Sequence, residues 1–393
     1  MNCCVVIPTT KSNYEQGFSA PLAWLFSGYE NRVRGIYSVD LTPTAIGPFD
    51  TFIIELNWFT TLHEFGKIVS FIREHQPRAV ILFGGLFAQI HYRRIFQEYE
   101  VDYFIRGDNE LPIKLFLEGC KPSSIPNIVG RDFENPIDYR FSAAEFERLE
   151  YSLDWFPDYG KYPRYRDSMT FPLPMLLTSK GGCCCIHSGC QYCLGSQTGV
   201  LESAYGREPV AMGQPTLMGQ LSTLSARFRV FSLYVLTPFS YDFAGQFFNA
   251  TAMIEIDSPV SLTQARETMS AFRRCRLMLP LYEEGVMGKT IRADLDELLA
   301  LEDEEHRLTF FLYDRDISAV AARLPESNRS ASLTPIWTSR FFDFSYYSDF
   351  EKARSFSREI FYRFPFQLRG GPTTPPWGTA FPWRQGRPRD RDS

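Results

Sequence analysis

The chain has 393 residues, of which 44% are hydrophobic, so it is long enough for two or three ordinary domains with apolar cores. Its 41 Lys and Arg residues against 46 Asp and Glu residues give a formal net charge of −5, which argues against nucleic acid as a partner. The longest apolar stretch, residues 79–90, is about half of the roughly 20 residues that a membrane helix needs, so no membrane span is expected. The first ten residues lack the pattern of a secretory signal, which predicts a cytoplasmic protein with reduced thiols.

The first 130 residues alternate short β-branched or aromatic runs with amphipathic stretches, which is typical of βαβ units around a parallel sheet. Strands are predicted over Cys3–Ile7, Gly35–Leu41, Thr51–Leu56, Ala79–Phe83 and Tyr103–Ile105. The clearest helix is His63–His75, because Phe65, Ile68, Val69 and Ile72 recur at three- and four-residue spacing and define one buried face.

Two predicted loops at the carboxyl ends of these strands carry small, permissive residues. Gly84 and Gly85 follow the fourth strand, and Arg106-Gly107-Asp108-Asn109-Glu110 follows the fifth. Open α/β sheets hold ligands at this edge, and glycine lets the backbone approach a ligand closely. A glycine after a strand is also an ordinary way to turn, so the loops alone leave both interpretations open.

The rest of the chain divides into three parts. Residues 131–171 are rich in Pro and aromatics and predict a packed linker, and residues 370–393 predict a disordered tail rich in Pro and Arg. Residues 172–369 form a second α/β half, too short for a closed eight-fold barrel but long enough for an open six-fold one. Its predicted strands are Met175–Thr178, Val230–Leu236, Met253–Ile256 and Leu308–Leu312, with helices at Leu262–Arg274 and Ile291–Leu301.

Five of the nine cysteines fall within residues 183–193, and in a reduced protein such a group indicates a metal or cluster rather than disulfides. Cys190 and Cys193 are separated by two residues, and Cys185 precedes them in the same segment. A four-iron cluster held by three cysteines leaves one iron without a protein ligand, where a small molecule can bind.

Zinc is the competing metal for this segment. Cys183, Cys184 or His187 could complete a tetrahedral site with the Cys-x2-Cys pair. Structural zinc modules usually add a second ligand pair at a distance, whereas the later chain offers only Cys275 and His306, singly. The zinc interpretation therefore requires a compact site drawn from one loop.

The cysteine segment resembles the cluster loop of radical S-adenosylmethionine (radical SAM) enzymes. The resemblance rests on a strand, Thr178-Ser-Lys-Gly, a cysteine triplet ending in Cys-x2-Cys, and Gly195-Ser196. The family's usual spacing is Cys-x3-Cys-x2-Cys, whereas this chain has Cys-x4-Cys-x2-Cys if Cys185 is the first ligand, and a longer loop if Cys184 or Cys183 is. The resemblance implies that Cys185, Cys190 and Cys193 hold a 4Fe-4S cluster, that Gly195 and Ser196 hold the methionine end of S-adenosylmethionine, and that Tyr192 packs against its adenine.

The first half resembles the cobalamin-binding domain that precedes many radical SAM barrels. Residues 81–85 and 101–110 are similar to two blocks of that domain and occur in the expected order. The resemblance implies an α/β chain with an N-terminal Rossmann-like cobalamin-binding domain over residues 1–130 and a partial (β/α)6 radical SAM barrel over residues 172–369. The cobalamin contacts that it implies are Gly84, Gly85, Arg106, Gly107 and Glu110.

Within the predicted barrel, Glu255 and Arg266 are candidates to hold the amino-acid end of S-adenosylmethionine, although an ordinary surface ion pair is the alternative. The resemblance implies a radical SAM enzyme, most often a methyltransferase acting on an unactivated carbon or phosphorus of a small-molecule or natural-product substrate. It also implies a reducing partner such as flavodoxin or ferredoxin. Two alternatives stay open: a cobalamin-associated rearrangement, and a non-catalytic relative that binds metal or cobalamin.

Overall fold

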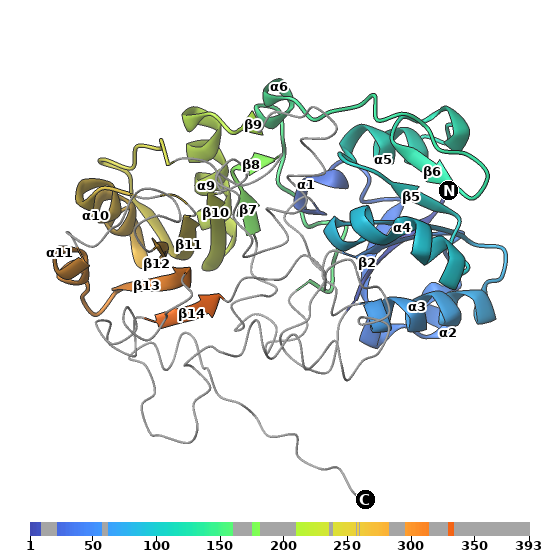
Figure 1. Ribbon diagram of the computed structural model, residues 1–393, viewed down its shortest axis with the longest axis horizontal. Coiled ribbons are helices and arrows are strands. Elements are labelled where there is room, and N and C mark those ends of the chain that lie inside the picture. Colours follow the sequence, from blue (N-terminus) through green and yellow to red (C-terminus); the bar gives the residue numbers. More distant parts are fainter. Residues whose placement is uncertain are drawn as a thin grey trace, which may run out of the picture.

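The structure is a computed structural model that describes residues 1–8, 22–56, 62–159, 175–180, 210–235, 239–256, 258, 260–282, 295–313 and 329–333. Two six-stranded sheets, each packed against helices, lie side by side (Figure 1). Within these residues, no helix combines the length and the apolarity needed to cross a bilayer.

The first sheet has the strand order β2-β1-β3-β4-β5-β6. Its strands are β1 (Cys3–Ile7), β2 (Val33–Tyr37), β3 (Thr51–Glu55), β4 (Val80–Gly84), β5 (Tyr103–Ile105) and β6 (Ile128–Gly130). The first five are parallel, and β6 pairs antiparallel with β5. Because the order reverses between β1 and β3, the carboxyl edge at that point is where open α/β sheets accept ligands.

Helices cover both faces of this sheet. They are α1 (Leu22–Leu25), α2 (Pro43–Ile46), α3 (Leu62–His75), α4 (Leu86–Glu98) and α5 (Glu110–Leu117), with 3-10 turns at Ser38–Asp40 and Pro122–Ser124. The expected apolar stripe of α3 is buried on the face that α4 also covers, so the predicted helix is confirmed with one added residue. Residues of α1 and α5 pack on the opposite face.

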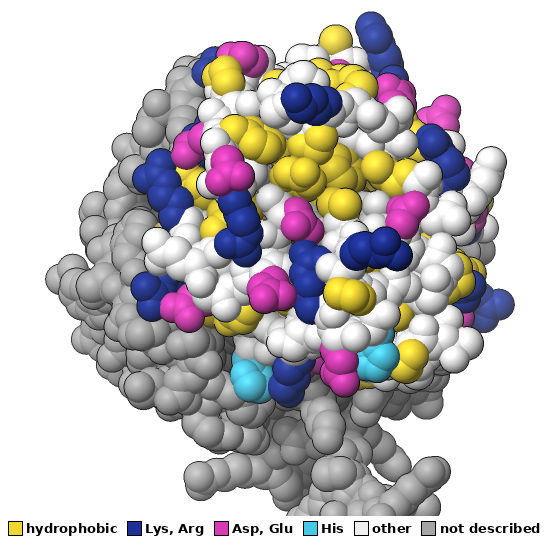
Figure 2. All heavy atoms as spheres, turned by 90° about the vertical axis from the view of Figure 1, so that its right-hand side faces the viewer, with side chains coloured by type: hydrophobic (Ala, Val, Ile, Leu, Met, Phe, Trp, Pro, Cys, Tyr) yellow, Lys and Arg dark blue, Asp and Glu magenta, His cyan; other side chains and the backbone are white. Residues whose placement is uncertain are grey.

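The outer surface over this half carries both signs of charge. Figure 2 shows Lys and Arg side chains interspersed with Asp and Glu over the described part of the face, around an apolar area. Interspersed charges give no single-sign field over that area, as the nearly balanced composition predicts.

Residues 131–159 form a packed connector between the sheets. The short helix α6 (Ala143–Phe146) begins with a capping box in which Ser142 and Glu145 satisfy each other's backbone groups. Trp155 is fully buried, and its carbonyl accepts a hydrogen bond of 2.8 Å from the Gly35 amide on β2. Side chains of the connector belong to the same apolar cluster as one face of each sheet, so one continuous core joins the two.

The second sheet has six parallel strands in the order β14-β13-β12-β11-β10-β7, which follows the chain order. They are β7 (Met175–Leu177), β10 (Val230–Val235), β11 (Phe248–Ile256), β12 (Phe272–Tyr282), β13 (His306–Tyr313) and β14 (Arg329–Leu333). Helices α9 (Gln214–Arg227), α10 (Leu262–Ser270) and α11 (Leu295–Leu299) accompany them, and β8 (Ser179–Lys180) pairs antiparallel with β9 (Val210–Ala211).

Several sequence predictions of elements were wrong. The predicted helix Leu262–Arg274 ends at Ser270, and Phe272 begins β12, which was not predicted. This stretch is a strand because β11 and β13 flank it and pair with it, a contact between distant segments that a local helical pattern does not register. Strands β6 and β14 were also missed, and the predicted strand Gly35–Leu41 runs from Val33 to Tyr37 before a 3-10 turn.

Candidate functional site

The carboxyl end of β4 carries the glycine pair predicted from the sequence. Gly85 has φ +115° and ψ 167°, a backbone conformation that only glycine adopts readily, and it precedes α4. Gly84 lies opposite the buried Glu55 of β3, and a Cβ built on Gly84 would meet no heavy atom of the described residues within 4 Å. Among the described residues, nothing covers the backbone of Gly84; residues 9–21 and 57–61, which follow β1 and β3, lie outside them.

The loop after β5 is braced from several sides. Gly107 has φ +65°, and its N–H donates a 3.0 Å hydrogen bond to Oε1 of Gln89 on α4. Arg106 forms an ion pair with Glu134 and donates a 2.5 Å hydrogen bond to the carbonyl of Asn135. Although burial acts to raise it, the Arg106 charge and hydrogen bonds from neighbouring side chains hold the pKa of Glu134 below its ordinary value. The predicted cofactor residue Arg106 thus shapes the loop through protein contacts.

A buried ion-pair cluster connects this loop to the second half of the chain. We call it the Lys180 cluster; its members are Lys180, Asp108, Glu110, Trp24 and Phe141. The Nζ atom of Lys180 lies 3.0 Å from Oδ1 of Asp108 and also pairs with Oε1 of Glu110. The three charged side chains are only 10%, 3% and 12% exposed, respectively. Because these side chains are so deeply buried, a charge left without a partner here would destabilise the fold.

The remaining groups of the Lys180 cluster come from two further segments. Nε1 of Trp24 on α1 donates to Oε1 of Glu110 over 3.1 Å. The amide of Phe141, in the connector, donates to Oδ2 of Asp108 over 2.7 Å, and the Phe141 ring centroid lies 4.7 Å from Nζ of Lys180. Oε2 of Glu110 is buried and accepts no hydrogen bond from the described residues.

The second sheet has one apolar and one polar face. Side chains such as Leu233 and Ile254 join the apolar cluster that includes Ala265 of α10. The alternate residues of the same strands face the other way, and the polar side chains among them include Ser232, Tyr234, Glu255, Arg276 and Thr309. A polar sheet face opposite a helix-covered apolar face is suited to line a site.

Glu255 and Arg266, the predicted pair, are not brought together. Glu255 lies on the polar face of β11, whereas Arg266 is exposed on α10, which packs on the opposite face. On the polar face, Nε of Arg276 donates to Oγ1 of Thr309 over 2.8 Å. Burial lowers the pKa of Arg276 to about 10, while the negative charge of Glu302 acts to raise it. The guanidinium therefore remains charged at neutral pH.

The cluster segment itself is not part of the described residues. Cys185, Cys190, Cys193, Tyr192, Gly195 and Ser196 all lie outside them. Within the described ranges, no group of three or more His, Cys, Asp or Glu side chains could hold a metal ion. The described thiols are the buried Cys3, Cys4 and Cys275 and the exposed Cys120.

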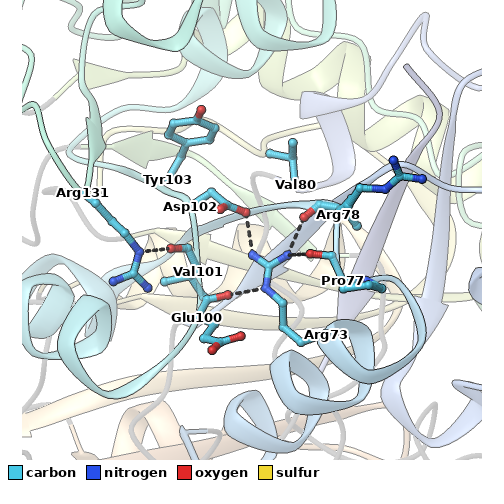
Figure 3. A pocket seen from close by; sticks show the side chains of 10 residues that line it. Arg73, Pro77, Arg78, Val80, Glu100, Val101, Asp102, Tyr103 and Arg131 are labelled. Carbon is cyan, nitrogen blue, oxygen red and sulfur yellow. Dashed lines mark hydrogen bonds and ion pairs between the residues drawn. The ribbon is translucent and has the colours of Figure 1, made fainter.

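A hollow of about 510 Å³ lies at the amino ends of β4 and β5, the edge opposite the glycine pair. Figure 3 shows Arg73 and Arg131 turned toward backbone carbonyls around it. Arg73 binds the carbonyls of Glu100 and Ala79 at 2.7 and 2.6 Å and the Asp102 carboxylate at 2.7 Å. Both arginines donate hydrogen bonds to backbone carbonyls, and Arg73 also pairs with a carboxylate. They therefore join the segments around the hollow and have a structural role.

Sequence reasoning missed three of the charged residues described above. Asp108 and Lys180 stand inside motifs quoted for the family resemblance but received no role, and Arg276 was assigned to no element. The available signal was a single charge placed within or next to a short buried strand, which requires a partner. The identity of that partner depends on tertiary contacts.

Solved structures of two enzymes are similar to this chain. TsrM from Kitasatospora setae, a radical S-adenosylmethionine methyltransferase solved with tryptophan substrate and a SAM analog, aligns with a TM-score of 0.51 at 13% identity, over 79% of this chain and 67% of its own. OxsB, a cobalamin-dependent S-adenosylmethionine radical enzyme solved with aqua-cobalamin and S-adenosylmethionine, aligns with a TM-score of 0.56 at 12% identity. Over the aligned residues, the chain has the fold of these enzymes.

The OxsB alignment covers 92% of this chain and 56% of OxsB, so the chain spans little more than half the length of that enzyme. TsrM has also been solved with cobalamin and a 4Fe-4S cluster bound. No protein-family model and no curated protein matches the chain. The similarity confirms, at the level of fold, the resemblance drawn from the cysteine segment and the glycine loops.

Proposed function

We propose that this protein is a cobalamin-dependent radical SAM enzyme that transfers a methyl group to an unactivated carbon or phosphorus of a small-molecule or natural-product substrate. The observation that carries the proposal is the place of the cysteine segment: it begins directly after β7 and β8, in a chain whose fold resembles TsrM and OxsB. A reducing partner such as flavodoxin or ferredoxin, in a cytoplasmic setting, belongs to the same proposal.

The residues present fit the two cofactors. Three thiols at Cys185, Cys190 and Cys193 are the donor set of a 4Fe-4S cluster with one open iron. At the edge of the first sheet, Gly84 leaves its backbone approachable, and Oε2 of Glu110 is a buried acceptor that has no partner among the described residues. Cobalamin carries amide donors around its ring, which such an acceptor can bind.

When bound, the cluster supplies an electron to S-adenosylmethionine, and cobalamin supplies a carrier for a methyl group. The protein's task is then to position these groups and exclude water. In this proposal residues 1–130 hold cobalamin and residues 172–369 hold the cluster, with Tyr192, Gly195, Ser196 and Glu255 around S-adenosylmethionine. Because Arg266 lies on the outer helix layer, the polar face favours Arg276 over it as a cation near that cofactor.

Anaerobic reconstitution with iron, sulfide and hydroxocobalamin tests the proposal. We expect about four irons per chain, retained cobalamin, and an electron paramagnetic resonance spectrum that shifts when S-adenosylmethionine is added. Zinc in place of iron, or no retained cobalamin, contradicts the proposal.

Single alanine variants of the segment's five cysteines identify the cluster ligands. Cys190→Ala and Cys193→Ala should each lose the cluster, and whichever of Cys183, Cys184 and Cys185 also does so is the first ligand. Cys120→Ala, at an exposed thiol far along the chain from the segment, is the matched control and should keep its iron.

Radical chemistry other than methyl transfer is the second candidate. It is favoured by the similarity to OxsB, a cobalamin-dependent S-adenosylmethionine radical enzyme. The reconstituted protein separates the two, because methyl transfer releases a methylated product and a rearrangement leaves the substrate's mass unchanged.

A further inference from the structure

The chain enters the cysteine segment at a point that is fixed on two sides. On one side, the Thr178 amide, just after β7, donates to the carbonyl of Tyr234 on β10 over 3.0 Å, and the carbonyl of Thr178 accepts from the Met212 amide over 2.7 Å. On the other side, two residues later, Lys180 is held by Asp108 and Glu110 of the first sheet's loop. Cys183 follows three residues after Lys180.

The loop that receives Lys180 is also rigidly held. The side-chain amide of Asn127 donates to the carbonyl of Asp108 over 3.0 Å, and that of Gln89 ties to Gly107 and to the carbonyl of Ile105. Lys180 therefore contacts a braced part of the proposed cobalamin edge.

Burying three charged side chains is an inefficient way to stabilise the contact between the two segments. Well-packed apolar side chains of the same volume usually stabilise a fold as well as a buried ion pair does, because burying charges carries a desolvation cost. A buried ion pair does, however, form only with an oppositely charged partner in the right position. This favours a role for Lys180 in fixing one relative position of the two segments.

We propose that Lys180 is a positioning residue: its ion pairs with Asp108 and Glu110 fix the end of β8, where the chain enters the cysteine segment, relative to the cobalamin edge of the first sheet. The inference rests on the proposed function in assigning cofactors to the two sides. The contact itself is independent of that assignment.

The test compares wild type with a neutral triple variant, Lys180→Met with Asp108→Asn and Glu110→Gln, which removes all three charges and leaves no lone buried ion. Lys180→Arg keeps the charge and should behave nearer to wild type. Two controls remove ion pairs elsewhere: Lys67→Met, an exposed pair with Glu64 on α3, and Asp154→Asn, which pairs with Arg227 between the connector and α9.

The first readout is hydrogen exchange of residues 175–180 and 105–110, which needs no cofactor. We expect exchange in the neutral triple variant at least about tenfold faster in both stretches, equal to about 1.4 kcal/mol of opening free energy, and no such change in either control. Exchange as slow as in wild type would overturn the proposal. A triple variant that unfolds is replaced in the comparison by Asp108→Asn with Glu110→Gln, which removes both ion pairs of Lys180 and leaves a lysine that can lose its proton, and the same outcome is decisive.

The second readout is magnetic coupling between reduced cluster and cobalt(II) cobalamin in the reconstituted protein. A positioning role predicts a weakened or broadened coupling in those chains of the triple variant that hold both cofactors, and coupling in those chains identical to wild type contradicts it. If S-adenosylmethionine turnover is measurable, a misplacement of about 1 Å should lower it roughly 100-fold. Wild-type protein that takes up neither cofactor would refute the proposed function, while the exchange result would still decide the role of Lys180.

Discussion

The substitution Lys180→Met should be among the most destabilising single changes in the chain. At 3.0 Å from Oδ1 of Asp108, one ion pair is worth at most about 5–6 kcal/mol at an effective dielectric constant of about 20. Removing the lysine leaves Asp108 and Glu110 facing each other while buried, and breaking a buried pair in this way costs roughly 3–5 kcal/mol. That is a large fraction of the roughly 5–15 kcal/mol that holds an ordinary domain folded.

Urea unfolding at pH 7.5, followed by circular dichroism and tryptophan fluorescence, measures this loss as a lower midpoint. The matched control Lys67→Met removes an ion pair at 3.6 Å whose lysine is 61% exposed, so its effect should stay below about 1 kcal/mol. Adding Asp108→Asn and Glu110→Gln to Lys180→Met should restore much of the stability, because no unpaired charge remains. Equal midpoints for the single and triple variants would refute the electrostatic reasoning.

Three further predictions concern the first sheet. Gly85→Ala should lower the free energy of unfolding by about 1–3 kcal/mol because alanine does not adopt φ +115° readily. Gly84→Ala should leave that free energy unchanged and weaken cobalamin binding in equilibrium dialysis. Equal stability of the two variants would contradict the backbone argument. Gly35→Ala places a Cβ 2.5 Å from the Phe156 ring and 2.8 Å from the Trp155 ring, both buried, and should lower the melting temperature by several degrees; an unchanged melting temperature would contradict the packing argument. The lowered pKa of Glu134 means that its ion pair stabilises the fold above pH 4.5, and that this stabilisation is lost as pH falls through the folded-state pKa. In Glu134→Gln the free energy of unfolding should therefore fall less steeply at acid pH than in wild type. An unchanged acid dependence would contradict this.

The parts of the fold that follow from local pattern were predictable. Helix α3 has its apolar stripe within one segment, and β5 matches its predicted bounds, Tyr103–Ile105. Strand β12 was mispredicted because its conformation depends on pairing with β11 and β13. A single window of sequence contains no information about those neighbours.

The candidate site divides in the same way. Gly85 and Gly107 were found because both adopt a positive φ in the turn after a strand, which favours glycine for reasons local to the turn. Arg106 was correctly placed in the loop after β5, whereas Glu110 is the first residue of α5; their protein partners, Glu134 and Lys180, were not foreseen. Charged side chains are long and their partners come from other elements, so position in a motif does not fix their contacts.

The sequence by itself determined the alternation of strands and helices, the glycine turns and the cysteine spacing, because each depends on residues close together in the chain. Only the tertiary structure decided that Lys180 meets Asp108 and Glu110, some 70 residues earlier, and that Glu255 and Arg266 lie on opposite sides of a sheet. Buried charges must find partners, but which partners they find depends on how the two sheets pack.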